Sequence, residues 1–304
     1  MRDPLDLFQR ASSRHTQTTI PGAMRMAYNG STVVATCIGE ETLGIHAVPL
    51  ASFLQNDNNN NGDFGTLLGD ILNKLAFLHD EGITVGAELL DPNEILIVRS
   101  TEGPQAILKF RRGVSPNKVE DIRSAGRVLN FIWTSRSRVP DTLVEDLISK
   151  MTAENTTMNA SEARVHFALW TNSKRMRFLM DVSEILELKQ NQHLEAVEKD
   201  GWLVINDSWI LTLAPVLREK VERDSRKRRS YSPTSVVDLL RFARNMAHHY
   251  HPLAPEVRSA LGPFENLGNF WVATFPLLLP HLHQAMKKFR GDTNCLRIRR
   301  FYSE

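Results

Sequence analysis

One stretch of the chain, residues 230–252, has the sequence signals of a complete amphipathic helix. Ser235 followed three residues later by Asp238 is typical of a capping box, and Pro252 ends the run, so we expect a helix over residues 236–250. Apolar residues recur along it at three- and four-residue spacing: Val236, Leu239, Leu240, Ala243, Ala247 and Tyr250. The rest of the chain must therefore supply an apolar partner for this stripe.

The opposite face of this helix is polar and carries groups that can bind a phosphate and transfer a proton. Arg244 offers a planar fork of donors, Asn245 an amide, and His249 an imidazole that titrates near neutral pH. At about 100° per residue Asn245 and His249 lie roughly 40° apart, and Tyr231 adds a phenol in the loop before the helix. These groups suffice, without a metal ion, for cleavage of RNA by its own 2′-hydroxyl. A merely solvated polar face is the alternative interpretation of the same spacing.

The last third of the chain contains the segments RSYSPTSVVDLLRFARNMAHHYHPLAPEVRSALG and FWVATFPLLLPHLHQAMKKF. They resemble the kinase-extension nuclease (KEN) domain, the family of the inositol-requiring enzyme of the unfolded-protein response and of ribonuclease L. The resemblance implies a catalytic set of four residues: Tyr231, Arg244, Asn245 and His249. In that mechanism His249 acts as the general acid and Tyr231 as the base or its orienter, while the other two bind the scissile phosphate. The basic pair that usually follows the Asn in the family is absent here.

The same resemblance implies an activity and partners. It implies a metal-independent endoribonuclease that cleaves stem-loop RNA or mRNA and leaves a 2′,3′-cyclic phosphate, as in the mRNA splicing of the unfolded-protein response. RNA rather than DNA is the implied substrate. The implied active form is a dimer, either a homodimer or a heterodimer with a full-length sensor kinase/ribonuclease. The alternative is a non-catalytic RNA-binding or heterodimerising regulator of such a sensor, although a pure scaffold has no physical need for all four residues.

Basic residues are concentrated at the end of the chain that carries this helix. Residues 201–304 hold 16 Lys and Arg against 9 Asp and Glu, a net charge of +7, whereas the rest of the chain is net −5. A polyanion is therefore drawn to the C-terminal third. The candidate RNA contacts are the basic run before Tyr231 and two residues of the helix: Arg226, Lys227, Arg228, Arg229, Arg241 and His248.

Residues 66–80 have apolar side chains at helical spacing, and LAFLHDEGI followed by NEILIV resembles the helix and catalytic loop of a protein-kinase C-lobe. The positions that carry the chemistry in a kinase are replaced. Leu89 stands for the catalytic Asp, Asp91 for the Lys, Glu94 for the metal-binding Asn, and Lys109 for the Asp of Asp-Phe-Gly. We therefore expect a pseudokinase without kinase activity, in which binding of ATP and Mg²⁺ is lost or weak.

These patterns and the resemblance predict a mainly α protein. We expect a loose leader over residues 1–30, a truncated, kinase C-lobe-like pseudokinase domain with a few short strands over residues 31–180, and an all-α KEN ribonuclease domain over residues 181–304. Within the last domain, Pro255 in a first turn and Gly262 after the run predict a short helix over residues 255–261.

Cys37 and Cys295 are the only cysteines, too few for a disulfide framework or a thiolate zinc site. The C-terminal histidines have no carboxylate or thiolate at ligand spacing, so we expect neither a metal site nor a cofactor. No apolar run is long enough to span a membrane. We therefore expect a protein of the cytosol or nucleus, and the resemblance adds recruitment to the cytosolic face of the endoplasmic reticulum.

Overall fold

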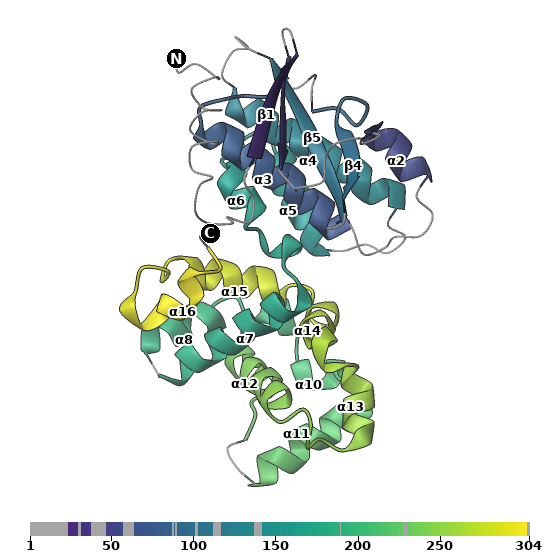
Figure 1. The fold of residues 1–304 in the computed structure, drawn as a ribbon. Helices are drawn as coiled ribbons and strands as arrows, with labels where there is room; N and C mark the ends of the chain where they lie inside the picture. The colour runs from purple at the N-terminus through teal and green to yellow at the C-terminus, as the bar shows by residue number, and fades with distance from the viewer. Residues whose placement is uncertain are drawn as a thin grey trace, which may run out of the picture. The chain divides into compact units, whose positions relative to one another are not determined.

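The computed structural model describes residues 24–29, 32–37, 47–56, 64–86, 88, 90–100, 103–111, 117–136, 142–188, 190–227 and 230–302. The chain divides into two compact units, and the boundary lies between Leu169 and Trp170 (Figure 1). Helices dominate the described residues, which confirms the prediction of a mainly α protein.

The first unit contains a five-stranded antiparallel sheet among its described residues. In sheet order the strands are β1 (Met24–Asn29), β2 (Thr32–Cys37), β5 (Gly103–Arg111), β4 (Leu96–Ser100) and β3 (Val48–Pro49). The nine-residue strand β5 lies at the centre, because it pairs with β2 on one side and β4 on the other.

The expected loose leader over residues 1–30 is wrong for residues 24–29, which form β1. In the hairpin of β1 and β2, Asn29 pairs with Thr32, so only Gly30 and Ser31 remain between the two strands. Residues 1–23 lie outside the described residues.

The helices of the first unit are α2 (Leu50–Asn56), α3 (Phe64–Asp80), α4 (Lys118–Arg136), α5 (Thr142–Thr152) and α6 (Ala160–Arg164), followed by the 3-10 turn η2 (Phe167–Leu169). Helix α3 confirms the helix predicted over residues 66–80, and it packs against β5, α4 and α6. Its apolar side chains share one face and are buried: Leu68, Ile71, Leu72, Leu75 and Leu78.

A buried carboxylate, Asp121 in the first turn of α4, holds the loop that follows α3. It accepts hydrogen bonds from the backbone N–H groups of Val85 at 2.8 Å and Gly86 at 2.9 Å, and it contacts His79 Nε2 at 2.9 Å. These three partners compensate for the cost of removing the charge from water. The contact orders the start of the segment that resembles a kinase catalytic loop.

All secondary structure in the described part of the second unit is helical, as predicted. Its elements are α7 (Asn172–Glu187), α8 (Asn191–Glu198), α9 (Trp202–Ile205), α10 (Trp209–Thr212), α11 (Pro215–Lys227), α12 (Val236–His248), α13 (Pro255–Leu261), η3 (Phe264–Asn266), α14 (Leu267–Thr274), α15 (Leu278–Lys287), η4 (Thr293–Cys295) and α16 (Leu296–Arg299). Helix α13 has the bounds predicted from its proline and the glycine that follows it.

The domain boundary expected at residue 180 would cut α7, which lies wholly in the second unit. Thr171 caps this helix, since its hydroxyl accepts a hydrogen bond from Lys174 N at 3.2 Å. Helix α7 lies beside α12 and α14 (Figure 1) and contributes three fully buried side chains to the core of that unit: Phe178, Leu179 and Val182. The boundary therefore moves to residues 169–170.

Helix α12 packs its apolar stripe against α7 and α8. Its buried apolar residues are Val236, Leu239, Leu240, Phe242, Ala243, Met246 and Ala247. The ring of Phe242 lies 5.6 Å from Trp209, 5.6 Å from Tyr231 and 6.0 Å from Trp271, measured between ring centroids. Aromatic clusters of this kind bury large areas and hold their members in defined orientations. Here the aromatic cluster holds α12 on the side opposite its polar face.

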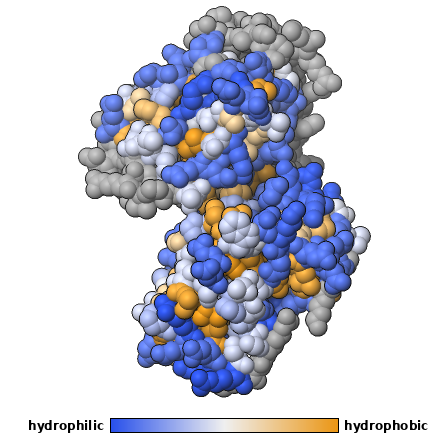
Figure 2. Space-filling model, turned by 180° about the vertical axis from the view of Figure 1, so that it is seen from behind, coloured by the Kyte–Doolittle hydropathy of each residue, from blue (hydrophilic) through white to orange (hydrophobic). Residues whose placement is uncertain are grey.

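The surface of the second unit is mixed in polarity. Seen from behind, it has hydrophilic areas with apolar areas between them (Figure 2). The large apolar side chains exposed in this unit are Leu188, Trp202, Leu203, Leu211, Phe264, Leu277 and Leu296. In the part of the chain that the structure describes, no helix combines the length and the apolar character that a membrane crossing requires.

Candidate active site

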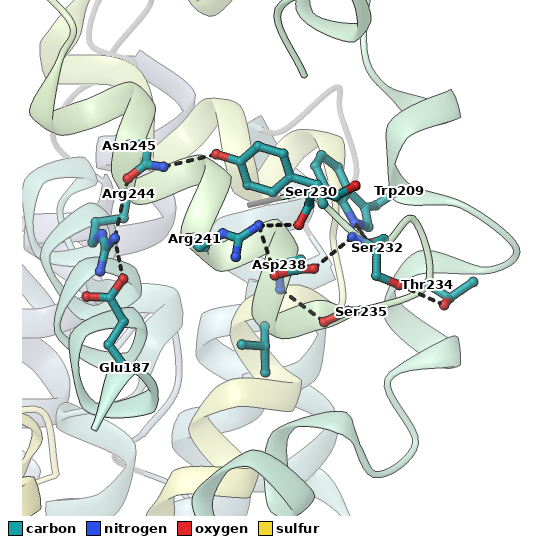
Figure 3. A network of polar contacts seen from close by, with 12 residues as sticks. Glu187, Trp209, Ser230, Ser232, Thr234, Ser235, Asp238, Arg241, Arg244 and Asn245 are labelled. Carbon is teal, nitrogen blue, oxygen red and sulfur yellow. Dashed lines mark hydrogen bonds and ion pairs between the residues drawn. The ribbon is translucent and has the colours of Figure 1, made fainter. Parts of the chain in front are cut away.

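The loop before α12 and the first turn of that helix hold each other in place (Figure 3). Ser235 Oγ accepts a hydrogen bond from Asp238 N at 3.1 Å, and the Asp238 carboxylate accepts one from Ser232 N at 2.7 Å. The predicted capping box is therefore only half formed, because Asp238 binds the loop instead of the N-cap backbone. Glu198 of α8 supplies the other carboxylate at this helix end and accepts from Val236 N at 3.1 Å.

The ring of Tyr231 is held inside this loop, and only 7% of the residue is exposed. It lies edge-on to Trp209 at 6.1 Å and to Phe242 at 5.6 Å. The guanidinium of Arg241 covers the ring at 4.3 Å and donates a hydrogen bond to Ser230 O at 2.7 Å. Arg241 thus holds both the Tyr231 ring and the backbone of the preceding residue, Ser230. The phenol oxygen of Tyr231 therefore has a defined position.

A chain of polar contacts leads from this phenol to the end of α7 (Figure 3). Asn245 Nδ2 donates a hydrogen bond to Tyr231 Oη at 3.0 Å, and its Oδ1 accepts one from Arg244 at 3.4 Å. Arg244 also pairs with Glu187 Oε1 at 2.6 Å. The fold therefore brings three of the four predicted catalytic residues into contact, and it adds Glu187, which the sequence analysis did not single out.

His249, the fourth predicted catalytic residue, lies just beyond the end of α12. The predicted helix over residues 236–250 is too long, since α12 ends at His248 and His249 is its C-cap with φ −107° and ψ 21°. Tyr250 leaves the apolar stripe because its hydroxyl donates a hydrogen bond to Gly262 O at 2.6 Å, beside α13. The His249 side chain is exposed and lines the same pocket as the other three.

The shared pocket has a volume of about 840 Å³ and is walled by α7, α11, α12 and the segment that leads into α13. Its charged lining residues are the bases Lys220, Arg223, Arg241 and Arg244 and the acids Glu187 and Asp224. Pockets of this size hold ligands as large as a nucleotide. The excess of bases over acids favours an anionic ligand.

Two of these bases, Lys220 and Arg223 of α11, were not among the predicted phosphate contacts. Lys220 pairs with Asp224 one turn further on. Arg223 has no ion pair or hydrogen bond within the described part of the chain. The sequence signal that could have predicted these contacts is the three-residue spacing of Lys220 and Arg223, which puts them on one face of a helix. The other face of this helix buries Leu217 and Val221.

The basic run before Tyr231 is not part of the described pocket lining. The Arg226 side chain is 82% exposed, and its guanidinium lies 3.8 Å from Glu222. The side chain of Lys227 and the whole of Arg228 and Arg229 lie outside the described residues. RNA contact by this run stays a prediction.

The two RNA contacts predicted on α12 differ in their surroundings. Arg241 lines the pocket, but its guanidinium is engaged with the Tyr231 ring and with Asp238 at 3.3 Å. His248 is exposed, lies 3.8 Å from Glu184 and is not among the lining residues. The contacts of Arg241 therefore hold the loop that carries Tyr231, and they leave less of its guanidinium for RNA.

The kinase positions predicted to be degenerate lie only partly in the described residues. Asp91 builds a turn, since its Oδ1 accepts from Asn93 N at 2.9 Å and its carbonyl oxygen accepts from Glu94 N at 2.9 Å. Leu89 and the side chain of Lys109 lie outside the described residues. The loss of kinase chemistry stays a prediction.

Comparison with known families finds a match within the helical second unit. Residues 175–299 match the family model of Ribonuclease 2-5A. This part of the chain is therefore similar to that ribonuclease family, in agreement with the resemblance seen in the sequence. The match contains all four predicted catalytic residues and nearly the whole second unit.

The relatives that the chain resembles are much longer proteins. "Serine/threonine-protein kinase/endoribonuclease IRE2" of Homo sapiens is 37% identical over 138 residues, which cover 44% of this chain and 14% of that protein. "Serine/threonine-protein kinase/endoribonuclease ire-1" of Caenorhabditis elegans is 32% identical over 167 residues, 53% of this chain and 16% of that protein. "Sensor for unfolded proteins in the ER ire1" of Schizosaccharomyces pombe is 29% identical over 150 residues, 48% of this chain and 13% of that protein. The matched region is thus a small part of each relative.

Proposed function

We propose that this chain is an endoribonuclease that cleaves RNA without a metal ion. In the reaction the 2′-hydroxyl oxygen attacks the adjacent phosphorus, the bond to the 5′-oxygen breaks, and a 2′,3′-cyclic phosphate and a 5′-hydroxyl result. The observation that supports this most strongly is the convergence of Tyr231, Arg244, Asn245 and His249 on one pocket. Two of the relatives are named as endoribonucleases, which supports the same class of reaction.

Binding of the scissile phosphate falls to Arg244 and Asn245. Arg244 has donors left beyond its pair with Glu187, and a guanidinium fork matches two phosphate oxygens. Negative charge on these oxygens grows as the phosphorane forms, so a cation held in place stabilises the transition state more than the bound RNA. Lys220 and Arg223 on the facing wall suit the neighbouring phosphates of the strand.

Proton transfer falls to His249 and Tyr231. The exposed imidazole of His249, when protonated, gives its proton to the leaving 5′-oxygen. Tyr231 Oη accepts one hydrogen bond from Asn245 and keeps a second lone pair, which can accept a hydrogen bond from the 2′-hydroxyl and so orient the nucleophile. When Tyr231 acts as the base, its phenolate oxygen takes the proton of that hydroxyl. The proton of the 2′-hydroxyl passes to the phenolate of Tyr231 and the leaving 5′-oxygen receives a proton from protonated His249, so the protons balance without another acid or base.

The first unit serves, in this proposal, as a catalytically dead kinase-like scaffold with lost or weak binding of ATP and Mg²⁺. The replaced kinase positions support it, as does the turn built by Asp91. The active form is a homodimer, or a heterodimer with a full-length sensor kinase/ribonuclease. It works in the cytosol or nucleus, and recruitment to the cytosolic face of the endoplasmic reticulum brings it to such a sensor.

The test is cleavage of a stem-loop RNA by the purified chain over a concentration series in excess EDTA, with analysis of the product ends. We expect cyclic-phosphate ends and a rate per chain that rises with concentration. His249→Ala should lower kcat by at least about 100-fold and keep the fold, because the side chain is exposed. His251→Ala, an exposed histidine outside the pocket lining, is the matched control and should cleave normally.

Equal cleavage by His249→Ala and the unchanged chain would remove His249 from the mechanism. RNA binding without cleavage at any concentration would favour the non-catalytic regulator instead. A requirement for Mg²⁺ would contradict the metal-free reaction.

A further inference from the structure

Three side chains with metal-binding atoms meet outside the catalytic pocket. His193 lies in the first turn of α8, Cys295 ends η4, and Asp292 lies just before η4. His193 Nε2 is 3.4 Å from Asp292 Oδ2 and 3.6 Å from Cys295 Sγ. All three ligand atoms lie within 4.8 Å of one another. None of these residues lines the catalytic pocket.

The spacing of these atoms is compatible with a shared ion, and the contact between His193 and Asp292 is long for a direct hydrogen bond. An N–H···O hydrogen bond is about 2.7–3.2 Å long, shorter than the contact between His193 and Asp292. Around Zn²⁺, bonds of about 2.0 Å to N and O and about 2.3 Å to S at tetrahedral angles separate N from O by about 3.3 Å and N from S by about 3.5 Å. The observed separations of 3.4 Å and 3.6 Å agree with those values.

One nitrogen of the His193 ring, Nε2, lies close to two partners, Asp292 and Cys295. His193 Nε2 carries either one proton or one lone pair, so it cannot form a full hydrogen bond to both Asp292 and Cys295. The other nitrogen, Nδ1, is buried and has no hydrogen-bond partner among the described groups. The position of this imidazole therefore depends on what Nε2 binds. A cation between the three groups can bind one atom of each of them at the same time.

The surroundings resemble those of a metal site with one open position. His193 and Cys295 are 0% exposed, and the edge of the Phe289 ring packs on the imidazole at 4.4 Å between centroids. The side chain of Asp292, in contrast, is 23% exposed. An apolar wall on one side strengthens ligand binding, and the open side admits a water molecule as the fourth ligand.

We propose that His193, Asp292 and Cys295 bind one Zn²⁺ ion. Nitrogen, oxygen and thiolate sulfur together suit this borderline-soft ion, whereas Mg²⁺ and Ca²⁺ prefer oxygen alone. The ion links α8 to the segment after α15, positions about a hundred residues apart in the chain, and it stabilises the second unit. The proposal differs from the sequence-based expectation of no metal site.

The test starts with protein stripped by a chelator and then titrated with Zn²⁺ or with Co²⁺ as a spectroscopic substitute. We expect one tightly bound ion per chain and a rise in Tm of about 5 °C or more with Zn²⁺. With Co²⁺ we expect a thiolate charge-transfer band and the strong d–d bands of tetrahedral coordination. Binding of no ion by the stripped, folded protein would overturn the proposal.

Variants separate this site from adventitious binding to other histidines and cysteines. Cys295→Ser should abolish the thiolate band, and Asp292→Asn should weaken binding at least about tenfold. Cys37→Ser and His251→Ala are the matched controls and should bind Co²⁺ like the unchanged chain. A thiolate band that persists in Cys295→Ser, or disappears in Cys37→Ser, would contradict the assignment.

Asp292→Asn keeps the test valid if Cys295→Ser does not fold, because this partly exposed side chain keeps its shape. A folded Asp292→Asn chain that binds Zn²⁺ as tightly as the unchanged chain would contradict the proposal. The ion is structural, so removing it should lower Tm without lowering the initial rate of RNA cleavage well below the unfolding temperature. A rate that falls at once on chelation would instead argue against the metal-free mechanism.

Discussion

Glu187 carries a negative charge beside the proposed phosphate site. Its carboxylate is 54% exposed and lies 2.6 Å from Arg244, whose side chain is only 12% exposed. Such a pair orients the guanidinium, but it also competes with an incoming phosphate for the same donors. Because solvent reaches the carboxylate, the attraction is screened and the competition is moderate.

Glu187→Gln should strengthen RNA binding. The substitution keeps the shape and a hydrogen-bond acceptor but removes the competing charge, so we expect Kd to fall by about two- to fivefold at low salt and less at high salt. Fluorescence anisotropy with an RNA that has a 2′-deoxyribose at the scissile position measures this without cleavage. Glu256→Gln, at an exposed carboxylate of α13 outside the pocket lining, is the control. Weaker binding by Glu187→Gln would show that orientation of Arg244 matters more than competition.

At the scale of elements, the site depends on how closely helices pack around α7. Helix α14 crosses the first turn of α7 at Gly268, which is buried. A Cβ atom at this position would overlap Asn172 O and lie 3.0 Å from Met176 N. Both neighbours are backbone atoms of a helix and cannot move aside without shifting α7. Only glycine allows this approach.

Gly268→Ala should therefore destabilise the second unit. We expect a loss of about 2–3 kcal/mol in the free energy of unfolding, seen as a lower Tm by calorimetry or circular dichroism. Gly69→Ala is the matched control, since Gly69 lies inside α3 with open space at its Cβ, and there alanine should add up to about 1 kcal/mol. A Gly268→Ala chain as stable as the unchanged one would show that α14 can shift freely.

At the scale of the whole molecule, we expect the two units to differ in how their stability depends on pH. In the first unit a buried histidine, His166, should lower the stability as the pH falls. His166 Nδ1 accepts a hydrogen bond from Ala168 N at 3.2 Å, and Nε2 lies 3.1 Å from Asp146 Oδ2. The neutral ring thus has both nitrogens satisfied, whereas a second proton would point at the Ala168 N–H. Burial lowers the pKa of His166 below its usual value of 6.5, although Asp146 acts in the opposite direction.

The pH dependence follows from this shift. Below about pH 6.5 the unfolded chain binds a proton at His166 more readily than the folded chain, so the stability of the first unit falls as the pH falls. Urea unfolding at pH 7.5 and pH 5.5 should show the loss, and His166→Gln, which cannot be protonated, should show less of it. His251→Gln, at an exposed ring in the second unit, should leave the loss unchanged. An equal loss in His166→Gln would assign it to other groups.

Local patterns predicted the helices well and the sheet poorly. Helices α3 and α13 were predicted from apolar spacing and from a proline and a glycine. The end of α12 was misplaced by two residues because Tyr250 bonds to Gly262, a contact that spacing within one helix cannot predict. Strand β1 was missed because its six residues gain stability only from pairing with β2.

The amino-acid sequence by itself determined the helical class of the second unit and, through resemblance, the four residues of the candidate site. Both depend on local spacing, which a helix converts directly into a face. Only the tertiary structure decided that Tyr231 meets Asn245, that Glu187 and Arg223 line the same pocket, and that His193 reaches Cys295. These contacts join residues between 14 and 102 positions apart in the chain, and their proximity follows from the packing of whole helices and loops rather than from any local pattern.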